Sequence, residues 1–180
     1  LIKTPEQKVF SLFAMNPESA FYGREISKKL GISPGAVHAA LHSLEKREML
    51  ESQLVGKTRL FHSRTSNPTV QAFTVLNALL VLEPLVEALK DNSRRIILFG
   101  SYAKGTFTAS SDLDLLIVSV EKEQILKKIG SFKRKCALDI RPIIKDQIQW
   151  MNLELENREL FDELGRGVVL WERSEGESGF

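Results

Sequence analysis

Two short apolar runs in the second half of the chain constrain its fold more than any other feature. The first, Arg94–Phe99, ends at Gly100-Ser101, and the second is Asp112–Val118. Apolar runs of this length, separated by small polar residues, indicate two buried β-strands. The second half of the chain therefore contains a small sheet, and the polar residues at the ends of these strands lie at its edge.

The second run begins with a pair of carboxylates. Residues i and i+2 of a strand share one face, with Cα atoms about 6.5 Å apart, so Asp112 and Asp114 point to the same side. Two such carboxylates can converge on a pair of divalent ions about 3.5–4 Å apart, the geometry of in-line phosphoryl transfer. Gly100 would let the backbone approach phosphates, and Ser101 with the free amides of a helix start could hold their oxygens. The alternative is a solvated or capping pair without a metal.

A third carboxylate is expected from a neighbouring strand. Cys136–Ile143 alternates so that Asp139 and Arg141 share one face. Asp139 can complete a metal site, or it can form an ion pair with Arg141 and bind no metal. Pro142 predicts that this strand ends here or lies near the edge of its sheet.

The stretch GSYAKGTFTASSDLDLLIV resembles the signature of the DNA polymerase β-type nucleotidyltransferases, in the spacing of their minimal branch. The resemblance covers about residues 94–172, including a helix at 157–165 and a strand at 168–171. It implies a metal-dependent enzyme that uses Mg²⁺ or Mn²⁺ and ATP or another nucleoside triphosphate. The implied catalytic and metal-binding residues are Asp112, Asp114 and Asp139, and the implied nucleotide-binding residues are Gly100, Ser101, Lys104 and Ser111.

The first third of the chain shows helical and then strand-like periodicity. Three helices are predicted at about 6–15, 23–30 and 34–47, followed by a hairpin over 53–64 with a basic tip. Ser33 can cap the third helix, with Pro34 at its first position. This order of elements resembles the winged helix-turn-helix domains of prokaryotic transcriptional regulators, over about residues 4–66.

This segment predicts contact with duplex DNA. Residues 19–66 carry 8 Lys or Arg against 4 Glu, which favours phosphate contacts. Side chains that read base edges are scarce on the exposed face of the third helix, so binding is expected to be weakly sequence-specific. A winged helix that binds protein instead is the alternative. The predicted DNA-contacting residues are Lys46, Arg47, Lys57, Arg59, His38 and His42.

A helix is predicted from Asn67 to about Leu82, where Glu83-Pro84 breaks or kinks it. It is apolar over more than one face, so it is buried either between two domains or against its copy in a homodimer through residues 68–82. The apolar stretch is too short and too interrupted to span a bilayer, and no membrane association is expected. The single cysteine, Cys136, suits a reducing cytoplasm and is expected to be an inert core thiol.

The sequence thus predicts an α+β chain. It comprises a winged helix of three helices plus a β-hairpin (1–66), linker helices (67–92), a nucleotidyltransferase domain with a small mixed β-sheet flanked by helices (93–173) and a flexible tail (174–180). The short segment after Ile144 leaves little chain to enclose a small acceptor. We therefore expect adenylyl transfer from ATP to a macromolecular hydroxyl, above all on a protein, coupled to DNA binding and transcription regulation.

Two alternatives remain open on the sequence. In one, the protein is a DNA-binding regulator whose nucleotidyltransferase domain senses a nucleotide or holds a partner without turnover. In the other, which follows from the family resemblance, it is antitoxin-like and works beside a small helical protein of the HEPN type. Retention of three carboxylates favours activity, because clustered like charges are costly without cations.

Overall fold

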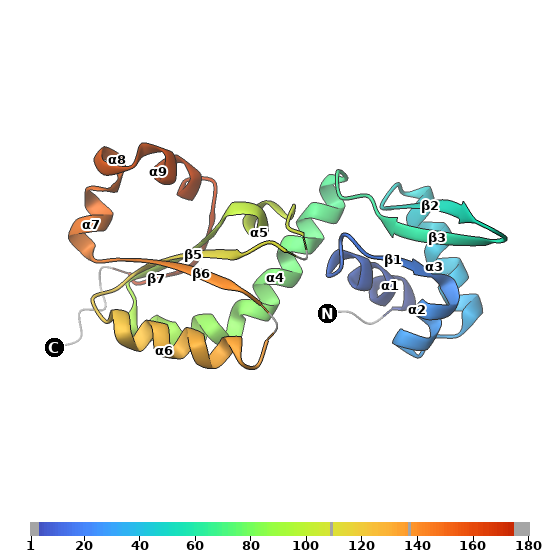
Figure 1. Cartoon of the computed structure of the whole chain (residues 1–180), viewed down its shortest axis with the longest axis horizontal. Helices are drawn as coiled ribbons and strands as arrows, with labels where there is room; N and C mark the ends of the chain where they lie inside the picture. The colour runs from blue at the N-terminus through green and yellow to red at the C-terminus, as the bar shows by residue number, and fades with distance from the viewer. Residues whose placement is uncertain (1–3, 109, 137, 175–180) are drawn as a thin grey trace. The chain divides into compact units, whose positions relative to one another are not determined.

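The computed structural model describes residues 4–108, 110–136 and 138–174. Its contacts divide the chain into two compact units. The first runs to Asn77 and includes Gly105–Ser110, and the second comprises Ala78–Lys104 and the residues from Ser111 onward. Each unit combines helices with a sheet, which confirms the predicted α+β class (Figure 1). Most of the predicted flexible tail, residues 175–180, lies outside the described residues.

The first unit packs three helices against a three-stranded antiparallel sheet of order β1-β3-β2. The helices and the hairpin lie where the sequence predicts them, and Ser33 caps the third helix by accepting a hydrogen bond from the Ala36 amide at 3.3 Å. Val37, Leu41 and Leu44 are buried in the core, as their spacing predicts. The elements are α1 (Pro5–Ala14), β1 (Ala20–Tyr22), α2 (Gly23–Leu30), α3 (Pro34–Lys46), β2 (Leu50–Val55) and β3 (Thr58–Ser63).

The predicted end of the next helix near Leu82 is wrong. The α4 helix (Pro68–Leu89) continues through Pro84 and is followed by a short 3₁₀ turn, η1 (Lys90–Asn92). Leu82, Leu85 and Leu89 are at most 1% exposed. Burying three leucines contributes about 1.5–3 kcal/mol each, which exceeds the cost of about 3 kcal/mol for a proline inside a helix.

Because α4 continues through Pro84, the helical segment reaches the length of a membrane-spanning helix. Residues Pro68–Asn92 are long and apolar enough to cross a bilayer by length and composition, contrary to the expectation of a stretch too short and interrupted. A core helix of a soluble protein passes the same test, and the leucines at one end of α4 are buried in the second unit. Of the most apolar 18-residue window of this helix, 33% is buried.

The second unit contains the predicted mixed sheet, of order β6-β5-β4-β7. Its β5 strand is antiparallel to β4 and parallel to β6, and β6 is an edge strand, as Pro142 predicts. The strands are β4 (Arg95–Phe99), β5 (Leu113–Val118), β6 (Ile140–Lys145) and β7 (Val168–Glu172). The helices that follow α4 are α5 (Gly100–Lys104), α6 (Lys122–Lys133), α7 (Gln147–Met151), α8 (Leu153–Glu156) and α9 (Arg158–Leu164).

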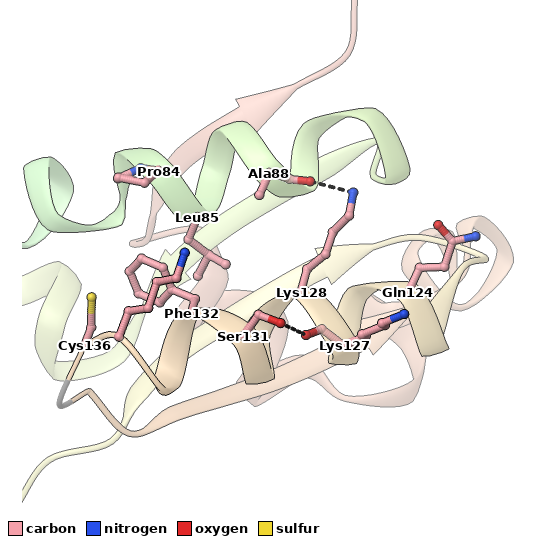
Figure 2. Close-up of a pocket in the computed structure, with 10 residues that line it drawn as sticks. Pro84, Leu85, Ala88, Gln124, Lys127, Lys128, Ser131, Phe132 and Cys136 are labelled. Atoms are coloured by element: carbon pink, nitrogen blue, oxygen red, sulfur yellow. Dashed lines mark hydrogen bonds between the residues drawn. The ribbon is translucent and has the colours of Figure 1, made fainter.

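The two faces of this sheet are covered by different helices (Figure 1). Leu116 and Val118 of β5 pack with Leu153 of α8 and Leu164 of α9. The alternate residues of β5 are equally buried on the other face, where α6 runs beside the second half of α4 (Figure 2). Because Asp114 alternates in step with Leu116, it lies on the face that α8 and α9 cover farther along the strand.

Candidate active site

Asp112 and Asp114 lie at the start of β5, as the sequence predicts. Asp112 directly precedes the strand and Asp114 is its second residue, opposite Phe99 of β4. Both carboxylates are half-buried. Leu113 between them is 1% exposed, so it fills the core while its neighbours point to the opposite side. Local strand geometry therefore places the two carboxylates together at one edge of the sheet.

Asp139 is brought beside this pair by the parallel β5–β6 ladder. The backbone amide of Leu113 donates to the carbonyl of Asp139 at 2.7 Å, and Asp114 lies opposite Arg141. The same register, continued by one step, sets Asp139 next to Asp112. The three aspartates and Arg141 thus share one face at the point where both strands begin.

Gly100 is required here for two reasons. Its φ is +71°, a left-handed conformation that favours glycine. A Cβ atom at this position would lie 2.5 Å from Oδ2 of Asp114. The backbone of Gly100 therefore packs directly against the Asp114 carboxylate and leaves no room for a side chain. Ser101 follows Gly100 in α5, and Ser111 directly precedes Asp112, so both hydroxyl-bearing residues belong to the segments that frame the carboxylates.

Comparison with known proteins agrees with this geometry. A family described as Nucleotidyltransferase domain matches residues 82–168. A protein of Methanocaldococcus jannaschii, named a "putative protein adenylyltransferase", is 32% identical over 93 residues, which are 49% of this chain and 87% of that protein. The chain belongs to the nucleotidyltransferase family of enzymes. A second protein of the same organism and the same descriptive name is 42% identical over 62 residues, which are 31% of this chain.

The match to that second nucleotidyltransferase relative spans 63% of its length. Among solved structures, a "putative nucleotidyltransferase" from Sulfolobus solfataricus aligns with 61% of this chain and 87% of its own. Its sequence identity is 21% and its TM-score 0.35, a likeness too low to support a structural argument. Membership in the family accordingly depends on the sequence matches.

Cationic side chains pair with two of the carboxylates of this candidate site. Nη2 of Arg141 lies 2.7 Å from Oδ2 of Asp112, and Nζ of Lys133 lies 2.5 Å from Oδ1 of Asp139. The sequence offered a different pairing, Asp139 with Arg141. Lys133, at the end of α6, was not identified from the sequence, because the approach of this helix to β6 depends on tertiary packing.

Lys104 lies beside a glutamate. Its Nζ is 3.5 Å from Oε1 of Glu163 on α9, and the two side chains are 49% and 38% exposed. Glu163 is a second residue that the sequence did not single out, and it brings a fourth negative charge near Asp114. The predicted helix at 157–165 contains Glu163, but the approach of this residue to Asp114 depends on tertiary structure.

Asp114 carries the least compensated charge of the site. Burial is the main factor that raises the pKa of its carboxyl above the ordinary value. The attraction of Arg141 lowers this pKa, whereas the negative charges of Asp112 and Glu163 raise it further. A net upward shift means that the surroundings of Asp114 disfavour its ionised form. A cation placed beside it would relieve this cost.

Asp139 behaves in the opposite way. The hydrogen bond that it accepts from Lys133 is the main factor that lowers the pKa of its carboxyl, followed by the positive charge of Lys133, with smaller contributions from its interaction with Asp112 and from the charge of Arg141. Its side chain is 72% exposed. It is therefore an ionised, solvent-facing carboxylate that adjoins Asp112.

The donor set suits a divalent metal ion in its chemistry. Three carboxylates supply the hard oxygen ligands that Mg²⁺ and Mn²⁺ prefer, and the strand register places them on one face. Within the residues that the structure describes, no group of three His, Cys, Asp or Glu side chains is close enough together to hold a metal. Arg141 engages Oδ2 of Asp112 and Lys133 engages Oδ1 of Asp139, so each ion pair occupies one of the two oxygens of its carboxylate.

The residues predicted to contact DNA lie in the first unit, in two groups. His38 and His42 of α3 and Lys57 and Arg59 of the β2–β3 hairpin line a hollow of about 350 Å³. Lys46 and Arg47 are exposed at the end of α3.

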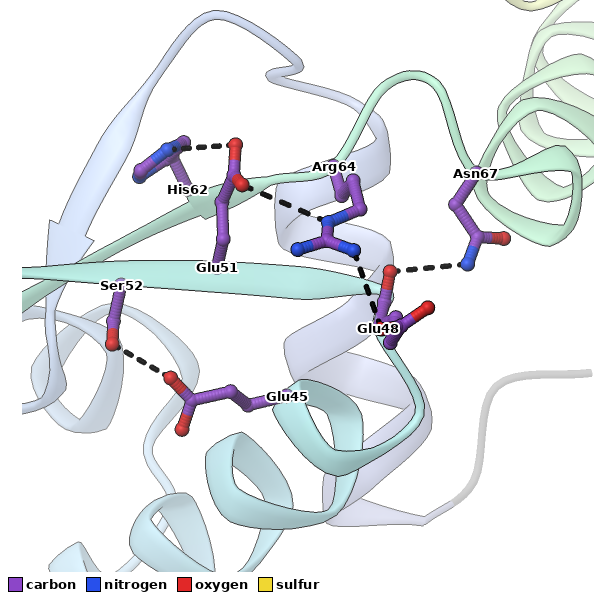
Figure 3. Close-up of polar contacts among 7 residues, drawn as sticks. All are labelled: Glu45, Glu48, Glu51, Ser52, His62, Arg64 and Asn67. Carbon is purple, nitrogen blue, oxygen red and sulfur yellow. Dashed lines mark hydrogen bonds and ion pairs between the residues drawn. The ribbon is translucent and has the colours of Figure 1, made fainter.

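Glutamates neutralise part of this basic surface. Arg59 pairs with Glu45 at 2.6 Å, and Arg47 pairs with Glu6 at 2.7 Å. Glu45 also accepts a hydrogen bond from the Ser52 hydroxyl at 2.7 Å (Figure 3). Of the four predicted DNA-contacting cations, Lys46 and Lys57 have no ion-pair partner among the described residues.

A polar cluster fixes the turn between α3 and β2 (Figure 3). Glu48 has a φ of +56°, in the left-handed region. Nδ2 of Asn67 donates to the Glu48 carbonyl at 3.0 Å, while Oδ1 of Asn67 accepts from the Thr69 amide at 2.8 Å. Arg64 lies 3.6 Å from the carboxylates of both Glu48 and Glu51. Asn67 thus starts α4, as predicted, and holds the strained turn at the same time.

Proposed function

We propose that the protein is a metal-dependent nucleotidyltransferase that moves the adenylyl group of ATP to a hydroxyl group of a macromolecule, above all a protein side chain. The observation that carries this proposal is the shared face of Asp112, Asp114 and Asp139 beside Gly100. The family match and two relatives named protein adenylyltransferase support it.

In the proposed reaction the acceptor oxygen attacks the α-phosphorus of ATP. The bond from this phosphorus to the bridging oxygen breaks, pyrophosphate leaves, and the hydroxyl proton passes to a carboxylate of the site. Asp112, Asp114 and Asp139 would hold divalent ions, which would make the acceptor nucleophilic and neutralise the triphosphate. Ser101 and Ser111 would bind phosphate oxygens from the segments that frame the site.

The exposure of the site favours a large acceptor. The side chains of Asp139 and Arg141 are 72% and 70% exposed, so the face above the carboxylates is open. A small acceptor is normally enclosed in a concave pocket. An open site instead suits a hydroxyl on a loop or tail of another protein, such as a HEPN-type partner, because the partner then supplies the missing wall.

Mass spectrometry after incubation with ATP and Mg²⁺ or Mn²⁺ tests this acceptor class. We expect one AMP mass, or a short run of such masses, on a hydroxyl-bearing side chain of a co-purifying protein or of this chain. Label that appears only on a small metabolite or an RNA end would exclude a protein acceptor and leave the nucleotidyl transfer standing. Tight nucleotide binding without any transfer would instead favour a regulator that senses nucleotide.

We further propose that the first unit is a winged helix that binds duplex DNA and links the enzyme to transcription regulation. The order of three helices and a hairpin supports this, together with the hollow lined by His38, His42, Lys57 and Arg59. Lys46 and Arg47 would extend the contact along α3. Two of these cations are already paired with glutamates, so we expect modest affinity through the phosphate backbone rather than base reading.

A further inference from the structure

A groove lies between the second half of α4 and α6, within the second unit (Figure 2). Its volume is about 660 Å³. It is lined by Pro84, Leu85, Ala88, Gln124, Lys127, Lys128, Ser131, Phe132, Lys135 and Cys136. The expectation that Cys136 lies in the core is wrong, because this residue is half-buried and lines the groove.

The groove has an apolar floor and wall. Leu85 and Phe132 face each other across it from α4 and α6 (Figure 2). Pro84 and Ala88 are exposed on α4, and Leu80, one turn before Pro84, is 39% exposed. Residues spaced by four lie on one side of a helix, so these three continue the apolar surface along α4. A row of exposed apolar residues beside a groove marks an interaction surface.

The polar side chains around the groove are basic or neutral. Nζ of Lys128 donates a hydrogen bond to the Ala88 carbonyl at 2.7 Å, in the last turn of α4 (Figure 2). Within the described part of the chain, the ammonium groups of Lys127 and Lys135 have no hydrogen-bond or ion-pair partner, and no Asp or Glu lines the groove. An occupant that is apolar on one side and negatively charged at its flanks would complement this lining.

We propose that this groove binds an acidic amphipathic helix of a partner protein. The groove follows α6, whose 12 residues extend over about 18 Å, or roughly three helical turns. A third helix can pack its apolar stripe between two existing helices, the mode in which amphipathic helices bind helical grooves. Acidic residues on its flanks then meet Lys127 and Lys135, which set its orientation and speed its association.

The groove adjoins the carboxylate site through the end of α6. Phe132 and Lys135 line the groove, and Lys133 between them holds Asp139 at 2.5 Å. A partner docked here is therefore held close to the proposed active site. The docking does not depend on nucleotidyl transfer, so a binding measurement tests it separately from the proposed activity.

The test uses a labelled synthetic 14-residue peptide with Leu at helical positions i, i+3, i+4 and i+7 and Glu and Ala elsewhere, titrated with the full chain by fluorescence anisotropy. We expect saturable binding, and we expect a matched peptide with Lys in place of Glu to bind at least about tenfold more weakly. Because Cys136 is the single cysteine, alkylation of its thiol reports the location, and the bound peptide should slow this alkylation.

A charge-reversed variant supplies the control for this mode of binding. Lys127→Glu with Lys135→Glu alters two exposed side chains without ion pairs, so the fold should survive. It should weaken the Glu peptide about tenfold and improve the Lys peptide, whereas Lys122→Glu, on α6 but outside the groove, should change neither. The proposal is overturned if the Glu peptide does not bind, if reversal leaves its affinity unchanged, or if Cys136 is not protected. Protection by duplex DNA or anionic lipid vesicles, but not by the peptide, would equally overturn it.

Discussion

Replacing Asp114 with asparagine should stabilise the protein. The carboxyl of Asp114 has a raised pKa because of burial and the charges of Asp112 and Glu163. Asparagine has nearly the same shape, so the close contact with Gly100 is kept while the charge is removed. The variant therefore isolates the electrostatic cost of this carboxylate in the folded chain.

The size of the effect follows from the strand geometry. Two unit charges about 6.5 Å apart repel by about 0.6–2.6 kcal/mol for effective dielectric constants between about 80 and 20. The attraction of Arg141 is larger than this repulsion and offsets it, so the net cost of the charge comes mainly from burial, with a contribution from Glu163. Solvent reduces this cost because Asp114 is only partly buried. We expect a net gain of about 1 kcal/mol, or about 2–4 °C in Tm for a chain of this size.

The pH dependence of stability tests separately whether Asp114→Asn is stabilising. A raised carboxyl pKa means that the folded state favours the proton, so the parent loses stability as the pH rises through the folded-state pKa of Asp114. The advantage of Asp114→Asn should be present at pH 7 and vanish below about pH 4, where the carboxyl is protonated in both states. Urea unfolding in low-salt buffer with chelator measures it.

A matched control separates this effect from a general loss of negative charge. Asp162→Asn removes an exposed carboxylate that pairs with Arg158 at 3.2 Å, and it should leave stability unchanged or slightly lower. If Asp114→Asn is equal to or less stable than the parent at pH 7, or if its gain does not depend on pH, the charge strain attributed to this site does not exist.

Three further perturbations follow from single contacts. Gly100→Ala should destabilise the protein by about 1–3 kcal/mol, measured by thermal melting, because the new Cβ would lie 2.5 Å from Oδ2 of Asp114. Unchanged stability would show that the Asp114 side chain can move away from Gly100 without cost. Glu48→Gly should raise stability by up to about 1 kcal/mol by relieving a φ of +56°, and a loss would mean that its side-chain contacts outweigh the strain. Lys57→Ala with Arg59→Ala should flatten the log–log salt dependence of DNA binding by about two units. An unchanged slope, or no binding at low salt, would favour a protein-binding winged helix.

The parts of the site that depend on local periodicity could be predicted from the sequence. The shared face of Asp112 and Asp114 follows from strand alternation alone, and Asp139 follows from the same rule in the next strand. Their meeting at one edge also needs the parallel β5–β6 register, which places Leu113 opposite Ile140. The sequence could anticipate this meeting because both strands begin next to their aspartates.

The cations of the site could not be predicted, since their positions depend on tertiary packing. Lys133 reaches Asp139 only because α6 ends beside β6, and Arg141 crosses to Asp112 on the neighbouring strand. The end of α4 could not be predicted for the same reason, because it too depends on tertiary packing. A proline normally stops a helix, but here the burial of Leu85 and Leu89 outweighs that local preference.

Calorimetric titration with ATP and Mg²⁺ tests the assignment of the three carboxylates most directly. The parent should bind, and Asp112→Asn and Asp114→Asn should each lose the binding heat, while Asp114→Asn melts above the parent temperature in chelator. Asp162→Asn should bind as the parent does. If Asp112→Asn and Asp114→Asn both bind MgATP as tightly as the parent, these aspartates do not hold the metal and the proposed active site is wrong.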